Sequence, residues 1–134
     1  MQGRTLLALG CTAVLLGLTA SADARCAPVS LRDDARQSSW VVEAVVERAG
    51  DPAQFRTVTV WKGGDQSPAQ VTLGAQQGRG YWPWHEPGSV GQRFLLFLRE
   101  TPDGGYSVRR CGATGEATDA RRAELRAFGL RPQD

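Results

Sequence analysis

GQRFLLFLRETPDGGYSVRRC, residues 91–111, is the stretch that decides the fold. Its apolar run from Phe94 to Leu98 is too short to span a membrane. The run fits a strand that is buried on both faces, although a buried helix has the same pattern. Residues 101–105, TPDGG, then have strong turn chemistry, because proline presets φ and glycine permits positive φ. Apolar and polar residues alternate from Tyr106 to Arg109, and this segment leads into Cys111. The stretch therefore predicts a β-hairpin whose second strand ends in a cysteine.

Three further segments have strand character: residues 40–47, 55–61 and 71–73. The first also has valines at helical spacing, but its β-branched residues and the Gly50-Asp51-Pro52 breaker that follows favour a strand. Ser30 can cap a short helical turn before these strands, and Thr118 can cap a helix after the hairpin. Residues 74–91 show no regular element. Five short strands with little helix indicate an all-β barrel or sandwich.

The first residues have the features of a secretory signal peptide. A positive start at Arg4 is followed by an apolar segment from Leu6 to Ala20, and Ala-x-Ala cleavage patterns end at Ala22 and Ala24. Cleavage after Ala22 leaves 112 residues with 15 basic and 14 acidic side chains, a net charge of +1. That balance gives no electrostatic reason to expect nucleic acid or anionic lipid as a partner. The sequence predicts a secreted or periplasmic protein with no membrane insertion after cleavage.

The chain has three cysteines, and Cys11 lies inside the apolar segment. In a lipoprotein Cys11 would become the new N-terminus, but Ala8-Leu9-Gly10 is a poor match to the residues expected before a lipidated cysteine. Removal of the signal peptide leaves Cys26 and Cys111. Two thiols that are exported together most often pair, so we expect a disulfide between them.

Two short motifs resemble those of bacterial secreted netrin-like domains. They are Val58-Thr59-Val60-Trp61-Lys62-Gly63 and Val90-Gly91-Gln92-Arg93-Phe94-Leu95-Leu96-Phe97, closed by Cys111. Members of this family share an OB-type five-stranded barrel with the tissue inhibitors of metalloproteinases. The resemblance covers about residues 26 to 115. It implies a small five-stranded OB-like antiparallel β-barrel over residues 23–116, after the signal peptide at 1–22 and before a C-terminal helix and tail at 117–134.

The sequence departs from the family's cysteine pattern. Family members commonly begin with a Cys-x-Cys pair and have another cysteine before the long apolar strand. Here Ala24 stands at the first of these positions, and the stretch around residues 81–84 has no cysteine. The chain thus lacks both partners of one family bridge, and the resemblance implies that Cys26 and Cys111 form the other. The metalloproteinase inhibitors use an N-terminal cysteine on the protease zinc, and neither expected cleavage makes Cys26 the N-terminus.

A loop of large amphipathic residues is the best site candidate: Tyr81, Trp82, Trp84, His85 and Glu86. Its rings could form a stacking platform for a peptide or sugar. Alternatively, Trp82 or Trp84 could plug an end of the barrel, and we favour this interpretation because small barrels need large side chains there. Arg121, Arg122 and Arg126 on the last helix could form a basic patch, but we expect a solvated helix face.

An enzyme is not expected. His85 is the only histidine, and it lies in a loop without the strand-turn-helix setting of a nucleophile elbow. No two-histidine metal site or phosphate-binding loop is available, so the sequence predicts no metal and no cofactor. We expect a monomeric, non-catalytic binding module for a protein, peptide or glycan in the envelope or outside the cell. The alternatives are a metalloprotease inhibitor and a small envelope enzyme using His85.

Overall fold

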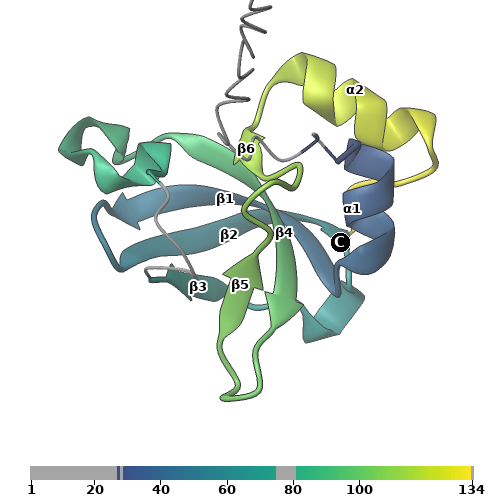
Figure 1. The fold of residues 1–134 in the computed structure, drawn as a ribbon. Helices are drawn as coiled ribbons and strands as arrows, with labels where there is room; N and C mark the ends of the chain where they lie inside the picture. Colours follow the sequence, from purple (N-terminus) through teal and green to yellow (C-terminus); the bar gives the residue numbers. More distant parts are fainter. Residues whose placement is uncertain (1–26, 28, 75–80, 134) are drawn as a thin grey trace, which may run out of the picture.

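The protein is a nearly closed antiparallel β-barrel with two helices packed on its outside (Figure 1). The computed structural model describes residues 27, 29–74 and 81–133. In chain order the regular elements are α1 (Leu31–Gln37), β1 (Trp40–Arg48), β2 (Ala53–Lys62), the 3-10 helix η1 (Gly64–Gln66), β3 (Gln70–Leu73), the 3-10 helices η2 (Pro83–His85) and η3 (Pro87–Ser89), β4 (Arg93–Glu100), β5 (Tyr106–Val108), β6 (Gly115–Glu116) and α2 (Asp119–Ala127). The predicted barrel, helical turn and C-terminal helix are confirmed.

Strand pairing runs in the order β3-β2-β1-β4-β5, and the two-residue strand β6 pairs with β4. The long central strands β1 and β4 are antiparallel, with Val42 opposite Leu96. Strand β3 also contacts β5, so the five longer strands nearly close on themselves. Closure removes most of the exposed sheet edge, as in OB-type barrels. Strand β6 has no signal in the sequence because it is only two residues long and is defined by its pairing with β4.

Strand β4 separates two hydrophobic cores. Its alternate residues Phe94, Leu96 and Leu98 face the barrel interior, and Leu95 and Phe97 face an outer cluster beneath the helices. All five side chains are at most 1% exposed. The continuous apolar run is therefore explained, because a strand covered on both faces has no position for a polar residue. The predicted hairpin follows, and the Thr101 N–H donates to the Gly105 carbonyl across its turn.

Both helices begin at the residues that the sequence predicts. The Ser30 side chain accepts from the Asp33 amide at the start of α1, and the Thr118 side chain accepts from the Arg121 amide at the start of α2. Each bond satisfies a backbone donor that has no partner within its helix. Leu125 of α2 is fully buried in the outer cluster. The C-terminal segment then returns to the barrel, where the Gln133 amide donates to the Val60 carbonyl at 2.7 Å.

The Trp61-Lys62-Gly63 motif joins the barrel to α1. The Trp61 ring is buried in the outer cluster, and the Lys62 Nζ donates to the carbonyls of Ala35 and Ser38 at 2.7 Å each. Gly63 has φ +114°, and a Cβ added there would lie 2.1 Å from the Trp40 ring. Only glycine combines a positive φ with the absence of a Cβ that would clash with the Trp40 ring. Each residue of the motif therefore has a structural task at the junction of β2 and α1.

Arg122 of α2 does not belong to the solvated face that the sequence suggested for Arg121, Arg122 and Arg126. Arg122 makes an ion pair with Glu43 of β1 at 2.5 Å, and only 4% of the Glu43 side chain is exposed. The hydrogen bond to Glu43 raises the pKa of Arg122 further above its ordinary value. Arg126 lies over the Trp61 ring, 5.2 Å from its centroid. For Arg122 the prediction was wrong, because its ion pair with the buried Glu43 holds α2 on the barrel, whereas Arg126 is exposed.

Two predictions involve residues outside the described ones. The signal peptide at 1–22, with cleavage near Ala22 or Ala24, lies entirely outside them. Of the predicted disulfide, Cys26 lies outside them and Cys111 is described. Within the described parts of the chain, no helix has the length and apolar character needed to cross a membrane.

Candidate functional site

The predicted site lies in the segment from Tyr81 to Gly91, which we call the aromatic loop. In Figure 1 it projects from the end of the barrel opposite the two helices. The sequence predicted no regular element here, but the structure contains the two short 3-10 helices η2 and η3. Proline begins each of them, at Pro83 and Pro87, where its fixed φ suits the first helical position. The aromatic loop is therefore a defined structure that presents its side chains in fixed directions.

Trp84 is a core residue. It is 2% exposed and belongs to the cluster inside the barrel. Its ring makes edge-on contacts with Phe55 and Phe94, each with a centroid separation of 5.4 Å. Edge-to-face packing is a preferred geometry for aromatic pairs. Trp84 closes this end of the barrel, as the favoured interpretation predicted.

Trp82 forms a second layer over Trp84. The two rings stack in parallel, with centroids 4.6 Å apart and an interplanar angle of 8°. Trp82 is half-buried, so one part of its ring supports the core and another part reaches the surface. The two tryptophans of the motif therefore have different roles, which spacing alone could not separate.

Backbone hydrogen bonds fix the aromatic loop to the barrel. The Trp84 carbonyl accepts from the Gly50 amide at 2.9 Å and from the Ser89 hydroxyl at 3.3 Å. At its end, the Gly91 amide donates to the Val46 carbonyl at 2.9 Å. Gly91 has φ +87°, a conformation that favours glycine. These bonds hold the loop on β1 and on the turn that follows it, so little order remains to be gained on binding.

The polar side chains of the predicted site are grouped around Tyr81. The Tyr81 hydroxyl donates to the Glu86 carboxylate at 2.5 Å, and its ring lies edge-on to the His85 imidazole at 5.7 Å. The bond to Glu86 raises the pKa of Tyr81 above its ordinary value. His85 Nδ1 accepts from the Trp82 amide at 3.4 Å, so its ring proton belongs on Nε2. The structure thus brings together all five residues of the predicted loop.

Two large apolar side chains are exposed among the described residues, and both lie in the aromatic loop. Tyr81 is 66% exposed and Val90 is 54% exposed. Sequence analysis treated Val90 only as part of a fold motif and missed it as a surface residue. The turn at Gly91 directs the chain into β4 before the apolar run begins. The sequence does not show on which side of that turn Val90 points.

The described surroundings of His85 come from its own loop. Its close partners are the Tyr81 ring and the Trp82 amide, and Glu86 is already bonded to the Tyr81 hydroxyl. No serine, threonine or cysteine nucleophile contacts the imidazole in the part of the chain that the structure describes. Across those same residues, no three His, Cys, Asp or Glu side chains lie close enough to hold a metal ion. Tyr81 thus links the His85 imidazole and the Glu86 carboxylate on the loop.

The region around Cys111 lies on the other side of the molecule, near α1. The Cys111 carbonyl accepts from the Val29 amide at 3.3 Å, which brings the segment just after Cys26 beside it. Asp34 of α1 is fully buried, and its carboxylate accepts from the Ala113 amide at 2.6 Å. The sequence pattern around Ser30 does not reveal the role of Asp34 in fixing the chain after Cys111. The Cys26–Cys111 disulfide stays a prediction, since Cys26 is outside the described residues.

The chain matches no family model, no curated protein and no solved structure in the comparisons made.

Proposed function

We propose that this protein is an exported, non-catalytic binding module of the netrin-like type, and that its partner contacts the aromatic loop. The observation that carries the proposal is the exposure of Tyr81 and Val90 on a loop whose backbone is already held in place. Both side chains lie on one loop of eleven residues, and apolar groups that gather on an exposed surface mark interaction sites. Tyrosine in particular supplies a large contact area at low entropic cost.

The composition of the surface favours a protein or peptide partner. Tyr81 offers a ring and a hydroxyl, His85 offers an imidazole with a donor on Nε2, and Val90 offers an aliphatic contact without hydrogen-bonding capacity. A glycan would use the Tyr81 ring for stacking, but it gains little from an exposed valine. A surface that combines aromatic, aliphatic and polar groups resembles the centre of a protein interface.

The netrin-like assignment is supported by the two sequence motifs and is compatible with the barrel. Trp61-Lys62-Gly63 lies at the junction with α1, and the second motif runs from the aromatic loop into β4. Export is supported by the signal-peptide pattern at residues 1–22.

The test is capture of partners from envelope extract by the exported protein and by a double variant. Tyr81→Ser with Val90→Ser removes both apolar contacts and leaves Trp84 and the backbone bonds in place. We expect the double variant to capture about tenfold less partner than the parent, or less still, because aromatic anchor residues contribute most of the binding energy of an interface. Ala127→Ser on the exposed side of α2 is the matched control and should capture as the parent does. Equal capture by the parent and the double variant would refute the proposal.

A further inference from the structure

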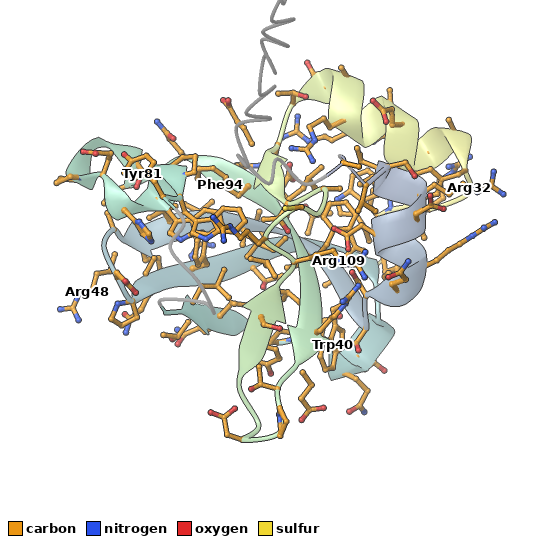
Figure 2. All side chains as sticks on the ribbon, in the orientation of Figure 1. Arg32, Trp40, Arg48, Tyr81, Phe94 and Arg109 are labelled. Carbon is orange, nitrogen blue, oxygen red and sulfur yellow. The ribbon has the colours of Figure 1, made fainter. Side chains whose placement is uncertain are left out.

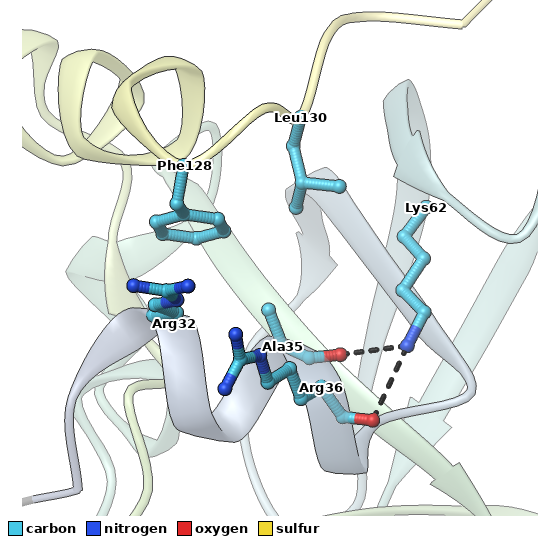
Figure 3. A pocket seen from close by; sticks show the side chains of 6 residues that line it. All are labelled: Arg32, Ala35, Arg36, Lys62, Phe128 and Leu130. Carbon is cyan, nitrogen blue, oxygen red and sulfur yellow. Dashed lines mark hydrogen bonds between the residues drawn. The ribbon is translucent and has the colours of Figure 1, made fainter.

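A pocket lies away from the aromatic loop, between α1, the end of β2 and the segment that follows α2. Figure 3 shows its six lining residues. The aliphatic and aromatic side chains of Ala35, Phe128 and Leu130 form one wall, and Arg32, Arg36 and Lys62 supply its polar groups. The cavity volume is about 180 Å³.

Among the described residues, the charged groups that line this pocket are all cations. Arg32 and Arg36 are one helical turn apart on α1, and their guanidinium groups lie below the Phe128 ring in Figure 3. Neither arginine forms an ion pair with a carboxylate in the described part of the chain. Lys62 is different, because its ammonium group donates to the carbonyls at the end of α1. The pocket therefore holds two guanidinium groups with unused donors and one ammonium group that is already engaged.

The position of Arg32 is not explained by the stability of α1. It lies in the first turn of the helix, where the helix dipole disfavours a positive charge. Asp33 and Asp34 do not line the pocket, and the Asp34 carboxylate is directed to the Ala113 amide. A bound anion would remove the repulsion between the neighbouring cations. Paired guanidinium groups bind a carboxylate through several charge-assisted hydrogen bonds.

The size of the pocket limits the ligand. A volume of 180 Å³ equals that of roughly six water molecules at about 30 Å³ each. It is smaller than the ~300–1,000 Å³ of sites for drug-sized molecules. A carboxylate alone would leave the wall of Phe128 and Leu130 uncovered, whereas a carboxylate joined to one ring or a short alkyl chain would cover it.

We propose that this pocket binds a small apolar carboxylic acid in its ionised form. The carboxylate lies between Arg32 and Arg36, and the apolar body lies against Phe128 and Leu130. This site is separate from the aromatic loop, so its occupation does not depend on the function proposed for that loop.

Phenylacetate is a suitable probe, because it joins one carboxylate to one ring. Titration of the purified protein, followed by ¹H–¹⁵N NMR, should shift the amide signals of Ala35 and Phe128 in a saturable manner. Phenylacetamide has the same shape without the charge, and acetate has the charge without the ring. Each should bind at least about tenfold more weakly, because charge-assisted hydrogen bonds and ring burial contribute separately.

Two sets of variants distinguish binding in the pocket from a general effect of the protein's positive charge on an anion. Arg32→Gln with Arg36→Gln removes both guanidinium groups from exposed positions without a burial cost, and it should weaken phenylacetate binding about tenfold or more. Arg48→Gln is the matched control, because Arg48 is an exposed arginine on the far side of the barrel (Figure 2). It should bind phenylacetate as the parent does.

Three results would overturn the proposal. One is equal binding of phenylacetate and phenylacetamide, and another is equal loss of affinity in the Arg48 control and the double variant. The third is binding of an Ala-Ala-Phe peptide with a free C-terminal carboxylate under conditions in which phenylacetate does not bind. That result would assign the pocket to a peptide terminus instead of a small acid.

Discussion

Replacement of Trp84 by alanine tests whether the aromatic loop is built on a core residue. Trp84 is 2% exposed and contacts three other rings, those of Trp82, Phe55 and Phe94. Truncation of a buried tryptophan to alanine costs about 3–5 kcal/mol through lost burial and the cavity that remains. The three ring contacts, each worth roughly 0.5–1.5 kcal/mol, place Trp84→Ala in the upper half of that range. For a domain of about 100 residues, a loss of about 4 kcal/mol lowers the melting temperature by roughly 15–25 °C.

Urea unfolding followed by circular dichroism measures this loss directly. Tyr81→Ala is the matched control, because it removes a 66% exposed ring from the same loop. The control should change the free energy of unfolding by less than about 1 kcal/mol, as exposed positions usually do. The slope of the free energy with urea should stay the same in both variants if the unfolded states are alike. A Trp84→Ala protein that is as stable as the Tyr81→Ala protein would refute the argument that Trp84 closes the barrel.

Two other predictions concern bonds that hold the outer elements. Arg122→Ala removes the nearer of the two arginines that pair with the buried Glu43 carboxylate and leaves only Arg93, at 4.0 Å. It should lower the free energy of unfolding by about 2–3 kcal/mol. Arg56→Ala breaks the exposed pair with Glu47 and should cost less than about 1 kcal/mol in the same urea experiment. Equal costs for the two variants would contradict the role given to Arg122. Thiol labelling of the unreduced, unfolded exported protein should find no free thiol if Cys26 and Cys111 are paired. One or two labelled cysteines per chain would contradict the disulfide.

The fold could largely be predicted because its decisive segments carry local signals. The run from Phe94 to Leu98 has no polar position, the turn at 101–105 contains proline and two glycines, and Ser30 and Thr118 are both good helix caps. Each of these signals acts over a few residues. Strand β1 was ambiguous for the same reason, since its valines fit two periods and only pairing with β2 and β4 decides between them.

The interactions that were missed join residues far apart in the chain. Glu43 interrupts a run of apolar residues and has the pattern of a solvent-facing strand position, but α2 covers it and supplies Arg122 from 79 residues away. Asp34 similarly meets Ala113 across 79 residues. Sequence alone does not show which helix covers which face of a barrel. The pocket between Arg32, Arg36 and Phe128 was missed for the same reason, because it is assembled only when α1 and α2 pack side by side.

The residues of the candidate loop lie together in the structure, but the sequence did not show how each is placed. Large rings, an imidazole and a carboxylate are concentrated in one short segment, residues 81–86, so local spacing alone keeps them close. The two tryptophans differ in burial because they stack, with Trp84 inside and Trp82 above it. Val90 is exposed because the chain turns at Gly91, a geometry that no local pattern specifies.

Site-specific photo-crosslinking in living cells tests most directly whether the aromatic loop is the contact surface. A photoreactive phenylalanine analogue replaces Tyr81 in one strain and Ala123, on the exposed face of α2, in another. We predict a discrete adduct of defined mass from position 81 and none from position 123. The same position-81 protein with Val90→Ser should give less adduct. No adduct from position 81, or adducts of equal yield from both positions, would contradict the claim that the partner binds at the aromatic loop.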